Sequence, residues 1–117
     1  MSAKAKYVFY VSMDVEPEKE DLFNDVYDNE HVPYLLEVPG VNAVTRLTRE
    51  PVRLAIAGEV KEMVAEGEPF FLATYEIDSP DVLISDAWAE AVERGRWGPE
   101  VRPYTSNRRH VLRKVMD

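Results

Sequence analysis

Four stretches of the sequence carry apolar residues in patterns typical of β-strands. Residues 7–13 and 70–77 are rich in aromatic and β-branched side chains at both odd and even positions, which predicts strands with two apolar faces. Residues 105–116 form a further strand-like stretch that is rich in arginine. Residues 41–49 alternate in polarity, and a period of two predicts one face made of Val41, Ala43, Thr45 and Leu47.

Two helices are predicted between these strands. The first begins at Pro17 and runs to about Val32. Pro33 has no backbone N–H and its ring crowds the preceding turn, so we expect a kink or an end near residues 29–32, followed by a short helical piece. The second helix is predicted to be capped by Ser79, to start at Pro80 and to end before Gly95.

The connections are less uniform than the helices and strands. Residues 38–41 read Val-Pro-Gly-Val, which suits a type II turn with proline and glycine at its centre. Residues 51–69 are interpreted as an insertion between the second and third strands, and insertions of this kind are often mobile. We expect residues 52–57 to extend the second strand as an edge strand, and residues 59–66 to form a short exposed helix.

This element order predicts a single α+β domain over residues 1–117. It is the β-α-β-β-α-β order of a ferredoxin-like sandwich, with an antiparallel sheet and two helices on one face. The other face of such a sheet usually meets water, yet here it carries Tyr10 and Phe70. Because exposing that apolar area would be unfavourable, we predict that a second copy covers it in a two-fold homodimer.

Composition narrows the class of protein. The net charge of −8 disfavours nucleic-acid binding, and no apolar stretch is long enough for a membrane helix. The chain has no cysteine, so neither a disulfide nor a thiolate metal site is expected. The first residues lack the apolar core of a signal peptide. We therefore expect a cytoplasmic protein that has no nucleic-acid or membrane partner.

His31 is the candidate residue with the most distinctive setting. It follows Phe23 and Tyr27 at spacings of four, which places the three side chains on one helix face and aims His31 toward the core. Asp28 precedes it by three residues, can hold a ring nitrogen and would raise the pKa of the imidazole. Three interpretations stay open: a core histidine that bonds carbonyls freed by the kink, a catalytic or ligand-binding histidine, and a metal ligand.

The remaining residues offer little support for other site types. No His-x-x-x-His or His-Glu-x-x-His spacing and no glycine-rich phosphate loop occurs, so no metal site is predicted. His110 lies on the arginine-rich strand and is interpreted as a surface or barrel-lining residue. Clustered acids and arginines are ordinarily solvated faces and ion pairs, although the arginines also suit a local pocket for an anion.

Several motifs together resemble the dimeric α+β barrel superfamily, and its EthD-like branch in particular. They are Tyr27-Asp28-x-Glu30-His31-Val32-Pro33, Val38-Pro39-Gly40-Val41, Trp88, Trp97-Gly98-Pro99-Glu100-Val101-Arg102-Pro103 and Asn107-Arg108-Arg109. The resemblance implies a homodimer whose two sheets form a barrel, a small-molecule cavity, and a functional histidine at His31. Relatives include cofactor-free oxygenases, isomerases, cyclases and dehydratases, so the fold alone does not fix the function. Motifs of the haem-degrading relatives are missing, and no cofactor is expected.

These observations lead to a hypothesis of cofactor-free proton transfer on a small aromatic or enolisable compound. His31 would act as general base or acid with Asp28 as its orienter. Substrate would be bound by Tyr10, Tyr27, Arg46, Tyr75, Trp97 and Arg108. Plain packing of the aromatic residues and surface ion pairs of the arginines are the simpler interpretations. A non-catalytic or stress-associated small-molecule binder, and an interaction subunit that uses its acidic helices, are the alternatives.

Overall fold

The computed structural model describes residues 6–116, and their main sheet is antiparallel with four strands in the order β2-β5-β1-β6. A separate two-stranded sheet pairs β3 with β4. The strands are β1 (Tyr7–Val15), β2 (Val41–Thr48), β3 (Val52–Ile56), β4 (Glu59–Met63), β5 (Phe71–Ile77) and β6 (Thr105–Lys114). The predicted ferredoxin-like α+β architecture is confirmed.

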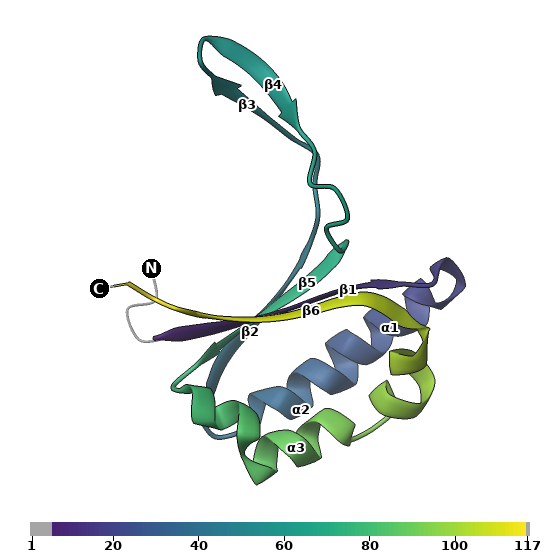
Figure 1. Ribbon diagram of the computed structural model, residues 1–117. Helices are drawn as coiled ribbons and strands as arrows, with labels where there is room; N and C mark the ends of the chain where they lie inside the picture. Colours follow the sequence, from purple (N-terminus) through teal and green to yellow (C-terminus); the bar gives the residue numbers. More distant parts are fainter. Residues whose placement is uncertain (1–5, 117) are drawn as a thin grey trace.

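The helical segments all cover one face of the main sheet (Figure 1). They are α1 (Glu20–Val26), a π-helical turn (Tyr27–His31), α2 (Val32–Leu36), α3 (Asp86–Glu93), a second π-helical turn (Trp97–Val101) and 3₁₀ turns at Pro17–Lys19, Pro80–Ile84 and Arg102–Tyr104. The core lies between this layer and the sheet. Its fully buried members include Phe23, Val26, Leu35, Tyr75 and Ile77. No helix within residues 6–116 is long and apolar enough to cross a membrane.

Pro33 is accommodated by a widened helical turn rather than by the predicted break. The backbone N–H of Val32 donates to the carbonyl of Tyr27, five residues earlier, which is the hydrogen bond of a π-helix. The ring of Pro33 therefore meets no tight α-helical turn, and the chain stays helical from Glu20 to Leu36. The irregularity lies where the sequence predicted it, and His31 is its last residue.

The second helix begins later than predicted. Residues Pro80–Ile84 form a 3₁₀ turn, Ser79 makes no side-chain cap, and Ser85 instead accepts a hydrogen bond from the N–H of Trp88 at 3.2 Å. The cap lies six residues downstream because the first turn is too tight to continue as an α-helix. The predicted left-handed residue at the other end is confirmed, since Gly95 has a φ of 77°.

A β-bulge in β2 overturns the predicted face assignment. The register shifts between Val41 and Ala43, which pair with Ile77 and Glu76, so the residues after the bulge change sides. Val41 is buried on the helix-facing side, but Ala43 and the residues in phase with it lie on the opposite side. Arg46, which pairs with buried Ala73, is thereby turned toward the helices.

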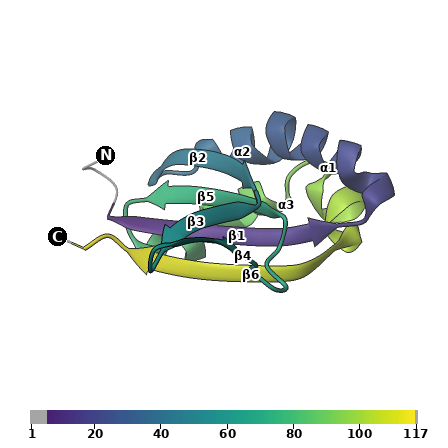
Figure 2. The ribbon, with the colours of Figure 1, turned by 90° about the horizontal axis from the view of Figure 1, so that it is seen from above.

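Residues 52–63 form a β-hairpin, so the predicted edge-strand extension and exposed helix were wrong. Ala57 and Gly58 join the two strands with φ values of 53° and 79°, and a two-residue loop with both φ values positive matches the twist of a hairpin. The hairpin leaves the sheet on the side opposite the helices and projects over it (Figures 1 and 2). We call it the arm. It raises the radius of gyration to 16.1 Å, against roughly 13 Å for a compact chain of this length.

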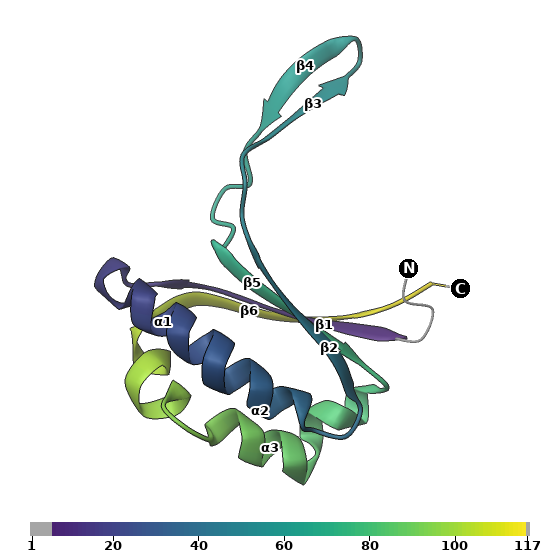
Figure 3. The same cartoon turned by 180° about the vertical axis from the view of Figure 1, so that it is seen from behind.

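The face of the main sheet opposite the helices, here called the reverse face, is not covered by any described helix (Figure 3). Tyr10 of β1 lies opposite Thr74 of β5 and Val111 of β6 on this face. Leu47 and Val111 are exposed there. The predicted two-sided character of the central strands is therefore present, with apolar residues on both faces.

Candidate active site

A cavity of about 170 Å³ lies between the sheet and the helical layer. Its floor is the helix-facing side of β1 and β5, with Phe9, Val11 and Tyr75, and its roof comes from α3 and the two π-helical turns. The lining is mainly aromatic and aliphatic, with a few polar groups, as is typical of small-molecule sites. The lining residues are Phe9, Val11, Met13, Tyr27, His31, Tyr75, Trp88, Val92, Trp97, Arg102, Arg108 and His110.

His31 forms part of the cavity wall and is 5% exposed. Its imidazole stacks on the indole of Trp97, with ring centroids 4.5 Å apart, and meets the edge of Tyr27 at 5.1 Å. The Nδ1 atom is fully buried and has no hydrogen-bond partner among the described residues. An unpaired buried polar atom of this kind is unfavourable by about 1–3 kcal/mol. Such atoms are rare in native structures, and a catalytic role is one of the reasons for keeping one.

Burial makes His31 a neutral imidazole at ordinary pH. Loss of hydration, followed by the positive charge of Arg102, lowers its pKa to about 4, with Glu93 acting weakly in the opposite direction. This direction is the reverse of the sequence-based prediction, in which a neighbouring carboxylate raised the pKa. The physical reason is that His31 lies among aromatic rings, and no carboxylate reaches its ring.

Two buried tyrosines share one hydrogen bond beneath the cavity. The hydroxyl oxygens of Tyr27 and Tyr75 lie 2.8 Å apart. Burial raises the pKa of Tyr27 to about 12 and that of Tyr75 well above its ordinary value. Both phenols are therefore neutral, and one of them donates to the other. They form a fixed polar wall of the cavity, and neither is a base at neutral pH.

One side of the cavity is cationic. Arg102 is held in place by Glu93, which accepts bonds from both terminal nitrogens at 3.0 and 2.9 Å. Arg108 lines the same cavity and makes no ion pair or side-chain hydrogen bond with another described residue. His110 stacks on Phe9 at 6.1 Å. The guanidinium of Arg108 is therefore the group in the lining that remains available for an anionic ligand.

Comparison with solved structures shows the same fold in two other proteins. An ethyl tert-butyl ether D (EthD) family protein from Bacillus halodurans C-125 superposes with a TM-score of 0.56 and 14% identity, over 94% of this chain and 99% of that one. A variant of MhuD with two manganese protoporphyrin IX molecules per active site superposes with a TM-score of 0.61 and 13% identity, over 95% and 96%. Neither protein-family models nor curated protein sequences give a match.

The chain has the EthD-like α+β fold of these two structures. At identities this low, the likeness establishes the arrangement of helices and strands and does not transfer any activity. This fold explains where the cavity lies, because the helical layer packs on one face of the sheet and the cavity lies between the two. The family resemblance seen in the sequence motifs is confirmed at the level of fold.

Five of the residues predicted to form the site line this cavity. They are His31, Tyr27, Tyr75, Trp97 and Arg108. Tyr10 lies elsewhere, since it pairs with Thr74 and Val111 on the reverse face. Its side chain is separated from the cavity by the sheet itself.

Asp28 and Arg46 form their own ion pair instead of joining His31. Arg46 Nη1 donates to Asp28 Oδ1 at 2.7 Å and Nη2 donates to Asn24 at 2.8 Å. The guanidinium lies 4.5 Å from the ring centroid of Tyr27, and Arg46 is not among the residues that line the cavity. The widened turn and the bulge in β2 bring these two residues together, and the predicted Asp28–His31 hydrogen bond is not formed.

Seven lining residues were not among those predicted for the site: Phe9, Val11, Met13, Trp88, Val92, Arg102 and His110. The rings of Phe9 and Trp88 pack together at 6.1 Å. Phe9 alternates with Tyr10 in β1, so its side of the strand was readable from the sequence. Nothing in the sequence indicated that Arg102, beyond Trp97, would turn back toward His31.

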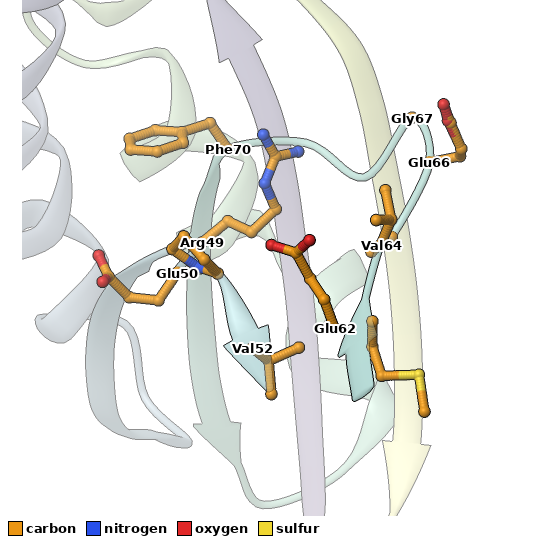
Figure 4. Close-up of a pocket in the computed structure, with 11 residues that line it drawn as sticks. Arg49, Glu50, Val52, Glu62, Val64, Glu66, Gly67 and Phe70 are labelled. Atoms are coloured by element: carbon orange, nitrogen blue, oxygen red, sulfur yellow. The ribbon is translucent and has the colours of Figure 1, made fainter. Parts of the chain in front are cut away.

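A larger hollow of about 490 Å³ lies at the root of the arm, between residues 49–52 and 62–70. Figure 4 shows Arg49 and Glu62 at this hollow, with Phe70 beyond them. Its lining is exposed, and no buried unpaired group among the described residues faces it. Within residues 6–116 no group of three or more His, Asp or Glu side chains is placed to hold a metal ion. The His31 cavity is therefore the candidate site.

Proposed function

We propose that this protein is a cofactor-free enzyme that transfers protons on a small aromatic or enolisable compound bound in the His31 cavity. One observation carries the proposal: His31 is buried and neutral, and it lines an aromatic cavity with an unpaired ring nitrogen. A structural histidine of the core would have a satisfied ring. The reaction class is isomerisation, cyclisation, dehydration or decarboxylation, or an oxygenase-like reaction that begins with proton removal.

His31 is the general base or acid in this proposal. A pKa of about 4 leaves the imidazole unprotonated at neutral pH, which is the form that accepts a proton. General bases work best with a pKa near the operating pH. An anionic substrate beside the ring would raise the pKa of His31 toward that range. Proton transfer is therefore coupled to the arrival of a negatively charged compound.

The cavity supports a flat compound with an anionic group. Tyr27, Tyr75 and Trp97 supply rings against which such a compound packs. Arg108 would hold a carboxylate or an enolate oxygen. A volume of about 170 Å³ is close to the roughly 150 Å³ of an engineered apolar cavity that takes up benzene. Compounds with one ring suit this size, and Asp28, Arg46 and Tyr10 are given no part in binding them.

A porphyrin does not suit the cavity. The MhuD variant binds two manganese protoporphyrin IX molecules in each active site. The cavity here is about 170 Å³, below the roughly 300–1,000 Å³ of sites for drug-sized ligands, and a macrocycle of four pyrroles would need α3 to move away. The proposal therefore stays with chemistry that needs no bound cofactor.

The proposed form of the protein is a cytoplasmic homodimer in which the reverse faces of two sheets pack together. Support comes from the exposed Leu47 and Val111 and from Tyr10 on that face. Removing such apolar area from water is favourable by about 25 cal/mol per Å². The barrel fold would then close from two copies.

A non-catalytic small-molecule binder is the second candidate. It is favoured by the absence of any described side chain that hydrogen-bonds the imidazole of His31 and orients it, because general bases are ordinarily held in position by such a group. This candidate predicts that a ligand raises the melting temperature without being converted. A ligand at 100 times its Kd should add about 2.7 kcal/mol to the free energy of unfolding.

Hydrogen–deuterium exchange into substrate tests the proposal before the reaction is identified. Single-ring carboxylates and enolisable ketones are incubated with the protein in D₂O, and NMR follows deuterium entering the position next to the carbonyl. We expect catalysed exchange with the wild type and none above background with His31→Gln. Asp28→Asn is the matched control, because Asp28 bonds Arg46 and should leave exchange intact.

The outcomes separate the two candidates. Exchange that persists in His31→Gln would rule out His31 as the acid or base. Thermal stabilisation by a compound that undergoes neither exchange nor conversion would favour the binder.

A further inference from the structure

The arm carries an apolar face that no other part of residues 6–116 covers. The register places Val52 opposite Met63, and Leu54 and Ile56 follow in phase on the same face, opposite the charged residues Lys61 and Glu59. All four side chains are exposed. A lone two-stranded hairpin is marginally stable in water, so an apolar face of this kind marks a surface that meets a partner.

The root of the arm is fixed by hydrogen bonds to the main sheet. Asn107 of β6 donates to Asp14 Oδ2 at 3.1 Å and to the carbonyl of Gly67 at 2.9 Å. Asp14 Oδ1 accepts from the N–H of Phe70 at 2.8 Å, and Arg109 donates to the same Gly67 carbonyl at 3.1 Å. Asn107 holds a left-handed backbone with a φ of 51° to make these contacts. The arm therefore leaves the sheet in a defined direction.

That direction places the arm above the reverse face. It stands on the side away from the helices in Figures 1 and 3, and in the view from above it lies over β1 and β6 (Figure 2). Any molecule that packs on the reverse face must therefore lie beneath the arm. The arm and the reverse face are two parts of one continuous binding surface.

Charge favours a second copy of this chain as the occupant. The arm carries two basic and two acidic side chains, which are Arg53, Lys61, Glu59 and Glu62, so it has no net charge. The reverse face carries Arg109, Arg113 and Glu76. The chain as a whole has a net charge of −8, and two copies would repel through their other surfaces. The arm and the reverse face are where this repulsion is smallest.

The area of the reverse face also supports a contribution from the arm to the interface. A stable interface buries about 800 Å² on each partner. The four strands are 7 to 10 residues long. At a spacing of about 4.8 Å and a rise of roughly 3.3 Å per residue, they give a flat footprint of about 540 Å². The sheet face alone is therefore a small interface, and the arm supplies a second surface set at an angle to it.

We propose that the arm of each copy packs its Val52, Leu54, Ile56 and Met63 face against a second copy seated on the reverse face, so that two arms hold the dimer together. The inference rests on the proposed pairing of reverse faces and is independent of any chemistry at His31. The arms increase the lifetime of the dimer, and the sheets set its two-fold geometry.

Matched substitutions on the two faces of the arm test this inference. Leu54→Glu with Ile56→Lys removes the apolar face, and each new charge lies opposite a residue of the other sign, Lys61 or Glu59. Ala55→Glu with Val60→Lys makes the same change on the other face, where these two residues pair. Val111→Glu alters the reverse face instead. Circular dichroism confirms folding, and sedimentation equilibrium of the full chain gives the dimer Kd.

We expect the dimer Kd to rise by about tenfold or more for the Leu54/Ile56 variant, with little change for the Ala55/Val60 variant. Amides of the arm should also exchange slowly with D₂O in the wild-type dimer. Equal Kd values for both arm variants, with dimerisation lost only in Val111→Glu, would overturn the arm contact and leave the sheet pairing standing. A wild type that stays monomeric would overturn both, without bearing on the His31 exchange assay.

Discussion

The imidazole of His31 and the indole of Trp97 lie in a face-to-face stack, with ring centroids 4.5 Å apart and planes inclined by 22°. His31 is the last residue of the π-helical turn Tyr27–His31, and Trp97 is the first residue of the π-helical turn Trp97–Val101. Trp97 is itself buried, and it shields one face of the imidazole from water. This contact between two widened turns contributes to the burial that, together with Arg102, lowers the pKa of His31 to about 4.

Replacing Trp97 with alanine should raise the pKa of His31 toward its ordinary value of about 6.5, because water then reaches the ring. The truncation should also lower the free energy of unfolding by about 3–5 kcal/mol. Trp97→Phe keeps a smaller ring over the imidazole, so both the pKa of His31 and the free energy of unfolding should be intermediate. NMR titration of the His31 ring measures the pKa. An unchanged pKa in Trp97→Phe and Trp97→Ala would show that Trp97 is not the cover.

Acid should destabilise the protein through His31 over a defined pH range. The unfolded imidazole binds a proton below about pH 6.5, whereas the folded one does so only near pH 4. Between these values the unfolded state binds more protons, so the free energy of unfolding falls as the pH is lowered through this range. The full effect is about 3 kcal/mol, at 1.36 kcal/mol for each unit of pKa difference.

His31→Gln isolates this contribution, since glutamine does not titrate. Carboxylates with lowered pKa values, such as Glu30 and Glu90, destabilise both proteins in acid and cancel in the difference. Urea unfolding at several pH values should show the wild type losing stability relative to His31→Gln between pH 6.5 and pH 4. A constant difference over that range would contradict the low pKa of His31.

The hydrogen bond between Tyr27 and Tyr75 predicts strongly non-additive mutations. Either Tyr27→Phe or Tyr75→Phe leaves one buried hydroxyl unpaired and should cost about 1–3 kcal/mol. The double variant removes both hydroxyls and should be much more stable than the sum of the single changes indicates. Thermal unfolding of the four proteins completes the cycle. Simple additivity would mean that the two hydroxyls do not depend on each other.

The sheet and its two apolar faces were readable from the sequence because a strand places alternate residues on opposite sides. Tyr10 and Phe9 were correctly separated by that rule in β1. The rule failed in β2, where a bulge shifts the register between Val41 and Ala43. A bulge depends on the pairing partner, which is far away in the sequence, so the local pattern could not reveal it.

The site was predictable only where regular geometry holds. The spacing of Tyr27 and His31 placed them on one face of a helix, and they do lie together. Asp28 would neighbour His31 on a regular α-helix, but the widened turn directs it to Arg46. Arg46 faces it only because of the bulge in β2. The widened helical turn and the bulge in β2 thus determine that Asp28 and Arg46 form an ion pair.

Gly95 sets the path of the chain from α3 into the turn that carries Trp97, and it should not tolerate a side chain. It has a φ of 77°, and a Cβ atom there would lie 2.5 Å from Glu30 Oε1 and 2.9 Å from Tyr34. Glu30 is held by two hydrogen bonds from Arg96, at 2.9 Å from the backbone N–H and 2.7 Å from Nε. Making room for the new atom would break this charged pair.

Gly58→Ala is the matched control for Gly95→Ala. Gly58 has a φ of 79° and nothing within 4 Å of its added Cβ, so that variant has only the left-handed backbone penalty of about 1–2 kcal/mol. Gly95→Ala should cost more than this, because its Cβ would also displace Glu30 from its hydrogen bonds to Arg96. Urea unfolding measures both, and a Glu30→Ala background should remove most of the excess. Equal losses in the free energy of unfolding for Gly95→Ala and Gly58→Ala in the wild-type background would show that Glu30 shifts to make room and keeps its hydrogen bonds to Arg96.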